Sequence, residues 1–181
     1  TYTGSAITPD VVVRDGSKVL KKDTDYTVGY TNNTNVGTAA VTITGTGNYS
    51  NSRTANFTIS AKSLSGNDVT LNFTPSGTTY TGSAIEGIVT VTIGEKTLVK
   101  DTDYTVSYNN NVNAGTNTAS VTVTGTGNYT DSKSYNFTIN AKSLADSDVT
   151  VAVAPPSTAY TGSAITGTVT VKFGSSTLAA G

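Results

Sequence analysis

The chain has 181 residues and a net charge of −1, and only 13% of its residues are charged. Because it has no basic stripe, nucleic acid is not expected as a partner, and no apolar stretch reaches the 18 or more residues of a membrane span. Histidine and cysteine are both absent, which excludes Ser-His-Asp and Cys-His catalytic arrangements and the usual zinc sites.

The first elements in chain order are short β-strands separated by turn signals. Residues 11–13 and Val19-Leu20 flank Asp15-Gly16, a dipeptide that favours a tight hairpin turn. Gly94-Glu95 and Gly174-Ser175 occupy the matching places later in the chain. The sequence therefore predicts a hairpin at each of these three positions.

The same strings recur along the chain in the same order. Tyr-Thr-Gly-Ser-Ala-Ile begins at Tyr2, Tyr80 and Tyr160, so a unit of about 80 residues recurs. The other recurring strings are Asp-Thr-Asp-Tyr-Thr-Val at 23–28 and 101–106, Thr-Gly-Thr-Gly-Asn-Tyr at 44–49 and 124–129, and Ala-Lys-Ser-Leu at 61–64 and 141–144. The second copy carries two extra residues between Gly115 and Val121. We interpret the chain as a tandem array.

Apolar residues alternate with polar ones within the segments between turns. Tyr104, Val106 and Tyr108 show this period of two, which indicates strands with one buried and one wet face. We expect seven strands in the second copy, at residues 68–73, 79–85, 89–93, 96–100, 104–108, 119–125 and 134–140. This pattern predicts an all-β fold of tandem Ig-like β-sandwich repeats. A β-grasp-like sheet is the alternative, although no amphipathic helix is evident.

The position of Ala-Lys-Ser-Leu places the unit boundaries near residues 60 and 140. The middle unit, 61–140, is then complete, whereas the first unit, 1–60, lacks its opening strand. The third unit, 141–181, stops after three or four strands. We therefore expect the chain to be part of a longer protein, or its two partial ends to complete each other between molecules. The short junctions lack Gly/Ser- or Pro-rich runs and predict a semi-rigid rod, with roughly 35–45 Å per unit.

Acidic and amide residues recur beside one predicted strand. Asp23 and Asp25, like Asp101 and Asp103, precede a strand, and we interpret them as turn formers because Asp side chains bond to nearby backbone. The alternatives are a carboxylate pair or, together with the Asn-Asn-Asn loop at 109–111, a calcium site. No EF-hand loop is present, and we predict no catalytic, cofactor-binding or metal-binding residues.

Two further alternatives concern lysine and tyrosine. Lys62 or Lys142 could form an isopeptide bond with Asn56 or Asn136, but alternation turns Asn136 outward beside Phe137 and argues against it. The ten tyrosines recur at fixed repeat positions, which favours packing against a small core over sugar binding. The Gly-x-Gly strings at 45–47 and 125–127 are interpreted as bends that end a strand.

The recurring strings resemble a repeat of Gram-positive cell-surface proteins. Tyr-Thr-Gly-Ser-Ala-Ile, Asp-Thr-Asp-Tyr-Thr-Val, Val-Thr-Val-Thr-Gly-Thr-Gly-Asn-Tyr and Asn-Phe-Thr-Ile are similar to bacterial Ig-like modules and to the related mostly-β-grasp surface repeats. The resemblance covers essentially the whole chain. It implies an extracellular, cell wall-associated location and a spacer or adhesive role, and it carries over no catalytic residue.

These observations together predict an extracellular structural spacer of a bacterial surface protein or adhesin, and not an enzyme. It would project other domains from the cell wall, with adjacent repeats of the same chain as its contacts. One alternative is a module that binds cell-wall or host glycans or host proteins. Another is an accessory domain of a large cell-wall enzyme whose catalytic part lies elsewhere.

Overall fold

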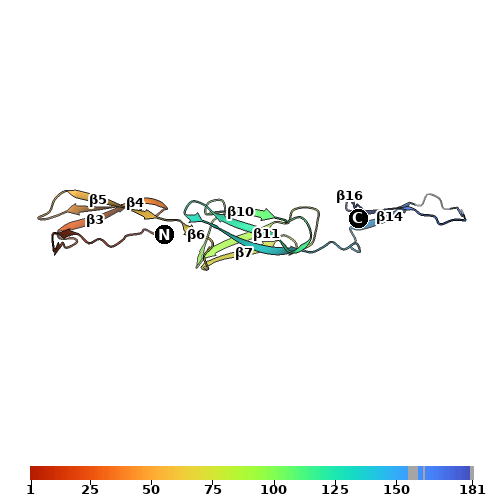
Figure 1. The fold of residues 1–181 in the computed structure, drawn as a ribbon, viewed down its shortest axis with the longest axis horizontal. Coiled ribbons are helices and arrows are strands. Elements are labelled where there is room, and N and C mark those ends of the chain that lie inside the picture. Colours follow the sequence, from red (N-terminus) through yellow and green to blue (C-terminus); the bar gives the residue numbers. More distant parts are fainter. Residues whose placement is uncertain (155–158, 161, 180–181) are drawn as a thin grey trace.

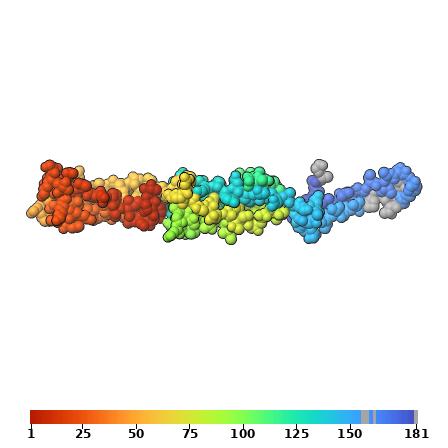
Figure 2. Space-filling view, turned by 90° about the horizontal axis from the view of Figure 1, so that it is seen from below, coloured from red at the N-terminus to blue at the C-terminus, as the bar shows by residue number. Residues whose placement is uncertain are grey.

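The computed structural model describes residues 1–154, 159–160 and 162–179. The third unit and the third Tyr-Thr-Gly-Ser-Ala-Ile string therefore include positions that lie outside the described residues. The described chain is all-β, and its strands form three bodies that follow one another along a single axis (Figure 1). The space-filling view shows the same extended outline (Figure 2). Within the described residues, no helix has the length and apolar character that crossing a membrane requires.

The middle unit consists of two three-stranded antiparallel sheets. The first sheet has the order β7 (Val69–Pro75), β8 (Gly87–Ile93) and β9 (Lys96–Thr97). The second sheet has the order β10 (Tyr104–Asn109), β11 (Gly115–Gly125) and β13 (Ser132–Ile139). A short parallel pair of β6 (Lys62–Ser63) with β12 (Tyr129–Thr130) joins the start of the unit to the second sheet.

The core of the middle unit lies between these two sheets. The alternation predicted for β10 is confirmed, because Tyr104 is buried, Val106 and Tyr108 are half-buried, and the residues between them are exposed. One cluster of buried residues contains Leu64, Val69, Val91, Leu98, Tyr104, Val123 and Tyr129. A second cluster contains Ile85, Ala119, Phe137 and Ile139. The first cluster has members from both sheets, and Phe73 of β7 packs against the second, so the middle unit is a β-sandwich.

Each sheet of the sandwich is a meander of neighbouring strands, apart from the short β12. The immunoglobulin topology instead distributes its strands between the two sheets in an interleaved order. The strand order therefore gives the finer Ig-like assignment no support.

The predicted strand at residues 79–85 is wrong. This stretch has only an isolated bridge between Thr79 and Asn140. Its backbone instead bonds to loops, because Tyr80 N donates to Asn140 O (2.8 Å) and Ile85 N donates to Asn111 O (2.7 Å). The short strands β6 and β12 were not predicted, since two-residue elements show no alternation. The remaining expected strands are present with shifted ends.

The first unit repeats the second sheet of the middle unit. It contains β3 (Tyr26–Thr31), β4 (Gly37–Gly45) and β5 (Ser52–Ile59), paired in the order β3-β4-β5. The predicted hairpin at Asp15-Gly16 is confirmed by the pairing of β1 (Arg14–Asp15) with β2 (Lys18–Val19). Residues 9–13, which precede this hairpin, belong to no strand.

The third unit repeats the first sheet of the middle unit. Its strands are β14 (Val149–Ala154), β15 (Thr168–Phe173) and β16 (Ser176–Thr177), paired in the order β14-β15-β16. The register matches the middle unit, because Val149 pairs with Phe173 as Val69 pairs with Ile93. Among the described residues of this unit, no second sheet faces this one, and Val151 and Val153 are more than half exposed.

Candidate functional site

The contact between the first and middle units is built around one lysine and two tyrosines. The Tyr2 ring packs edge-on against the Tyr129 ring with centroids 5.5 Å apart. Lys96 Nζ lies 5.5 Å from the centroid of each ring, and it donates a 2.9 Å hydrogen bond to the Tyr129 hydroxyl. That hydrogen bond raises the pKa of Lys96 above its usual value. The ammonium is therefore held between aromatic groups of two units, a favourable cation–π arrangement.

Hydrogen bonds of Asn128 also connect the first and middle units. Asn128 Nδ2 donates to Asn35 Oδ1 at 3.1 Å, and Asn128 Oδ1 accepts from the Val36 amide at 2.9 Å. The Asn128 carbonyl accepts from the Lys62 amide at 3.0 Å. One asparagine of the middle unit thus bonds to the loop that follows β3 and to the linker that leaves the first unit. We call these residues, together with Lys96, Tyr2 and Tyr129, the first junction.

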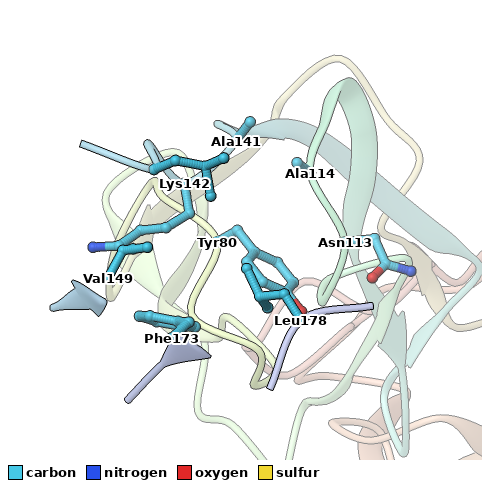
Figure 3. Close-up of a pocket in the computed structure, with 9 residues that line it drawn as sticks. Tyr80, Asn113, Ala114, Ala141, Lys142, Val149, Phe173 and Leu178 are labelled. Atoms are coloured by element: carbon cyan, nitrogen blue, oxygen red, sulfur yellow. The ribbon is translucent and has the colours of Figure 1, made fainter. Parts of the chain in front are cut away.

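The junction between the middle and third units also combines two aromatic rings with a lysine, but it contains an open cavity. The ring centroids of Tyr80 and Phe173 are 6.5 Å apart, and Lys142 Nζ lies 5.3 Å from the Phe173 centroid. The cavity has a volume of about 290 Å³, and side chains of both units face it (Figure 3). Asn113 lines it but has no partner equivalent to Asn128, because the described part of the third unit has no counterpart of β12.

The recurring aspartates form turns, as predicted. Asp103 Oδ2 accepts from the Val99 amide at 2.9 Å, and Asp25 Oδ2 accepts from the Lys21 amide at 2.8 Å. Asp23 and Asp101 adopt φ values of 63° and 64°, a left-handed conformation that Asp tolerates in turns. At the start of β3 and β10, one aspartate of each pair therefore accepts a backbone hydrogen bond, and the other adopts the left-handed conformation of the turn.

The residues of the alternative calcium site do not converge. Asp101 and Asp103 precede β10, whereas the loop at 109–111 follows it, so they lie at opposite ends of one strand. The Asn111 amide donates to Ile85 O at 3.0 Å, and the Asn110 amide donates to Thr118 O at 3.4 Å. No group of three or more His, Cys, Asp or Glu side chains that could hold a metal occurs among the described residues.

The lysines considered for an isopeptide bond pair with aspartates instead. Lys62 Nζ lies 2.6 Å from Asp68 Oδ2, and its hydrogen bond lowers the pKa of Asp68. Lys142 bridges Asp148 at 2.8 Å and Asp146 at 2.9 Å. Asn136 is exposed on β13, as its alternation predicted.

The prediction that tyrosines pack against the core of their own unit is confirmed at the position of Tyr26 and Tyr104. Tyr26 and Tyr104 are 4% and 2% exposed, and burial raises the pKa of Tyr104. Tyr2 instead contacts the neighbouring unit, which alternation within one strand does not predict. The contributions of Lys96 and Asn128 to the first junction were also missed. Their only sequence signal is recurrence, since Lys18 and Asn48 hold the same places in the first unit.

We expect Lys96→Met to loosen the first junction without unfolding either unit. Methionine keeps an apolar stem but removes the charge between the two rings, a loss of about 0.5–1 kcal/mol at such an exposed site. Residual dipolar couplings give one alignment tensor for the first unit and one for the middle unit. We expect these two tensors to differ more in the variant than in the unchanged chain, because the two units then move more independently. Lys18→Met is the matched control, because Lys18 lies over Tyr49 within the first unit at 5.7 Å. Equal effects of the two variants would contradict the role of Lys96.

Comparison of this chain with protein-family models, with curated proteins and with solved structures finds no match.

Proposed function

We propose that this chain is an extracellular structural spacer of a bacterial surface protein, which projects other domains from the cell wall. The observation that carries the proposal is the serial arrangement of its units, which lie along one axis and contact their neighbours end to end (Figure 1). Local cores joined in series allow length to be added unit by unit. The bacterial and extracellular parts of the proposal rest on the resemblance of the recurring strings to surface repeats.

The first junction supports a spacer because it limits bending. Two rings, one ammonium and the Asn128 bonds connect the units beside the covalent linker. A flexible linker alone would let the units tumble independently. No catalytic role is part of this proposal, and the ordered side chains at the junction serve to hold orientation.

Small-angle X-ray scattering tests the rod in solution. A compact protein of 181 residues has a radius of gyration of about 16 Å, and we expect about twice that value because the units lie end to end. Appending one more copy of residues 61–140 should lengthen the maximum dimension by roughly 35–45 Å. A radius of gyration near the compact value would contradict the spacer.

A display experiment tests the function itself. A reporter epitope would be anchored on a Gram-positive cell through zero, one or several copies of residues 61–140. We expect antibody access to the epitope to rise with copy number, and the chain alone to bind neither glycan arrays nor host cells. Saturable binding of the unanchored chain to a glycan or host protein would instead identify a binding module.

A further inference from the structure

The chain enters and leaves the middle unit at opposite ends of its long axis. It enters at β6, beside the first unit, and leaves after β13, beside the third unit (Figure 1). β6 pairs in parallel with β12, and β12 continues through Asp131 into β13. The entering and leaving segments therefore run in the same direction. A pull on the two linkers draws these segments past each other along their own length.

The entering segment is bonded to its parallel neighbour at two backbone positions. Lys62 N donates to Asn128 O at 3.0 Å, and Leu64 N donates to Thr130 O at 2.8 Å. We call these two hydrogen bonds the entry clamp. Bonds of this kind run between the strands, so a pull along the strands loads both of them at once. A pull across the strands would instead break such bonds one after the other.

Side chains reinforce the entry clamp. Leu64 is 0% exposed and belongs to the core cluster, so sliding β6 outwards also moves an apolar side chain into water, which is unfavourable. Lys133 of β13 donates from Nζ to Val69 O at 2.6 Å and to Gly66 O at 3.1 Å. This lysine connects the leaving strand with the turn that precedes β7. The start of the unit is therefore held both by its core and by its last strand.

A second parallel contact holds the leaving end of the unit. Asn140 follows β13 and forms a parallel bridge with the stretch that follows β7. Asn140 N donates to Thr78 O at 2.8 Å, and Tyr80 N donates to Asn140 O at 2.8 Å. We call these two hydrogen bonds the exit clamp. One of them recurs in the first unit, where Tyr2 N donates to Ser60 O at 2.7 Å.

We propose that the middle unit bears tension, because the entry and exit clamps resist a pull along the chain. Each clamp must slide before its linker can draw out the adjoining strand, and the bonds of a clamp then break in one step. Length alone does not require this resistance, since a rod that unravels at low tension still separates its ends when unloaded. Only the origin of the tension, a load on what the chain projects, rests on the spacer proposal.

The direction of pulling tests the proposal with every clamp residue unchanged. The chain contains no cysteine, so pairs of cysteine substitutions define where handles attach for single-molecule force spectroscopy. Ser60→Cys with Ala141→Cys pulls the middle unit lengthwise. Thr105→Cys with Thr124→Cys pulls crosswise, because these exposed residues are directly opposed on β10 and β11. At one constant force, we expect the lengthwise pull to open the unit at least about tenfold more slowly, since several hydrogen bonds break together.

The length of released chain identifies each event. Lengthwise unfolding frees about 80 residues at roughly 3.3–3.6 Å each, less a folded length of roughly 35–45 Å, so the tether should lengthen by about 220–250 Å. The crosswise pull first frees only the residues between its two attachment points, a gain of about 60 Å. The two directions are therefore distinguished in every recording.

Substitutions of Lys62 test one bond of the entry clamp. Lys62→Pro removes the N–H that donates to Asn128 O, and proline is tolerated at the first residue of a strand. Lys62→Ala is the matched control, because it removes the same ammonium and its ion pair with Asp68 but keeps the N–H. Under the lengthwise pull, we expect Lys62→Pro to unfold about fivefold or more faster than Lys62→Ala. Under the crosswise pull, the two variants should open at similar rates.

Three results would overturn the proposal. They are a lengthwise pull that opens the unit as fast as the crosswise pull, equal lengthwise rates for Lys62→Pro and Lys62→Ala, and a Lys62→Pro effect that is the same in both directions. Hydrogen exchange in β11 checks that both variants are folded, and the comparison of directions stands without them. The spacer role is measured separately, because scattering and reporter access record the length of the chain without load.

Discussion

Leu64→Ala should destabilise the middle unit by about 2–5 kcal/mol, the range for removing a buried leucine side chain. Leu64 is 0% exposed and belongs to the cluster between the two sheets, so its loss leaves a cavity that the surrounding strands cannot fill. Native-state hydrogen exchange at amides of β8 and β11 measures this unit apart from its neighbours. We expect those amides to exchange at least about 30-fold faster.

The chain contains a matched control for this substitution. Leu144 follows the same Ala-Lys-Ser string but is 65% exposed, so Leu144→Ala should change the stability of the third unit by less than about 0.5 kcal/mol. Similar effects of the two substitutions would mean that the middle core is not closed by Leu64.

Gly125→Ala should destabilise the middle unit by about 1–3 kcal/mol through overpacking. A Cβ at this position would lie 2.6 Å from Thr130 N and 2.8 Å from Tyr129 C, both of which are backbone atoms. Avoiding the clash would push β12 away from the end of β11. Because Tyr129 belongs to the first junction, alignment of the first and middle units should loosen as well. Hydrogen exchange in β11 and residual dipolar couplings measure the two effects.

Gly29→Ala is the control for strand glycines. A Cβ at Gly29 meets nothing within 4 Å, and its φ is not in the left-handed range. Alanine there should leave β3 unchanged or stabilise it by up to about 1 kcal/mol, because glycine loses more backbone entropy on folding. If Gly125→Ala were equally harmless, the close approach of β12 to Gly125 would not exist in solution.

The strands and turns of this chain follow closely from its local sequence. Alternation in residues 104–108 predicts which faces are buried, since side chains on a strand point to opposite faces in turn. Asp15-Gly16 predicts its hairpin because glycine tolerates a positive φ, which Gly16 adopts at 57°. Residues 79–85 show where this reasoning fails. Their backbone groups bond to loops instead of to a neighbouring strand.

The junction and the cavities depend on contacts between distant residues. Tyr2 meets Tyr129, and Asn35 meets Asn128, although nothing near any of them in the sequence indicates a partner. Recurrence identifies equivalent positions, but it does not say whether a tyrosine packs within its own unit or against the next one. The same holds for Leu64 and Leu144, which share a local sequence and differ completely in burial.

The amino-acid sequence by itself determined the repeating all-β character, the hairpins and the inward faces, because these depend on neighbours within a few residues. Only the tertiary structure decided how the strands divide into two sheets, which residues close the core at Leu64, and how the first junction forms. Those outcomes depend on which distant surfaces meet, and alternation specifies a buried face without specifying what covers it.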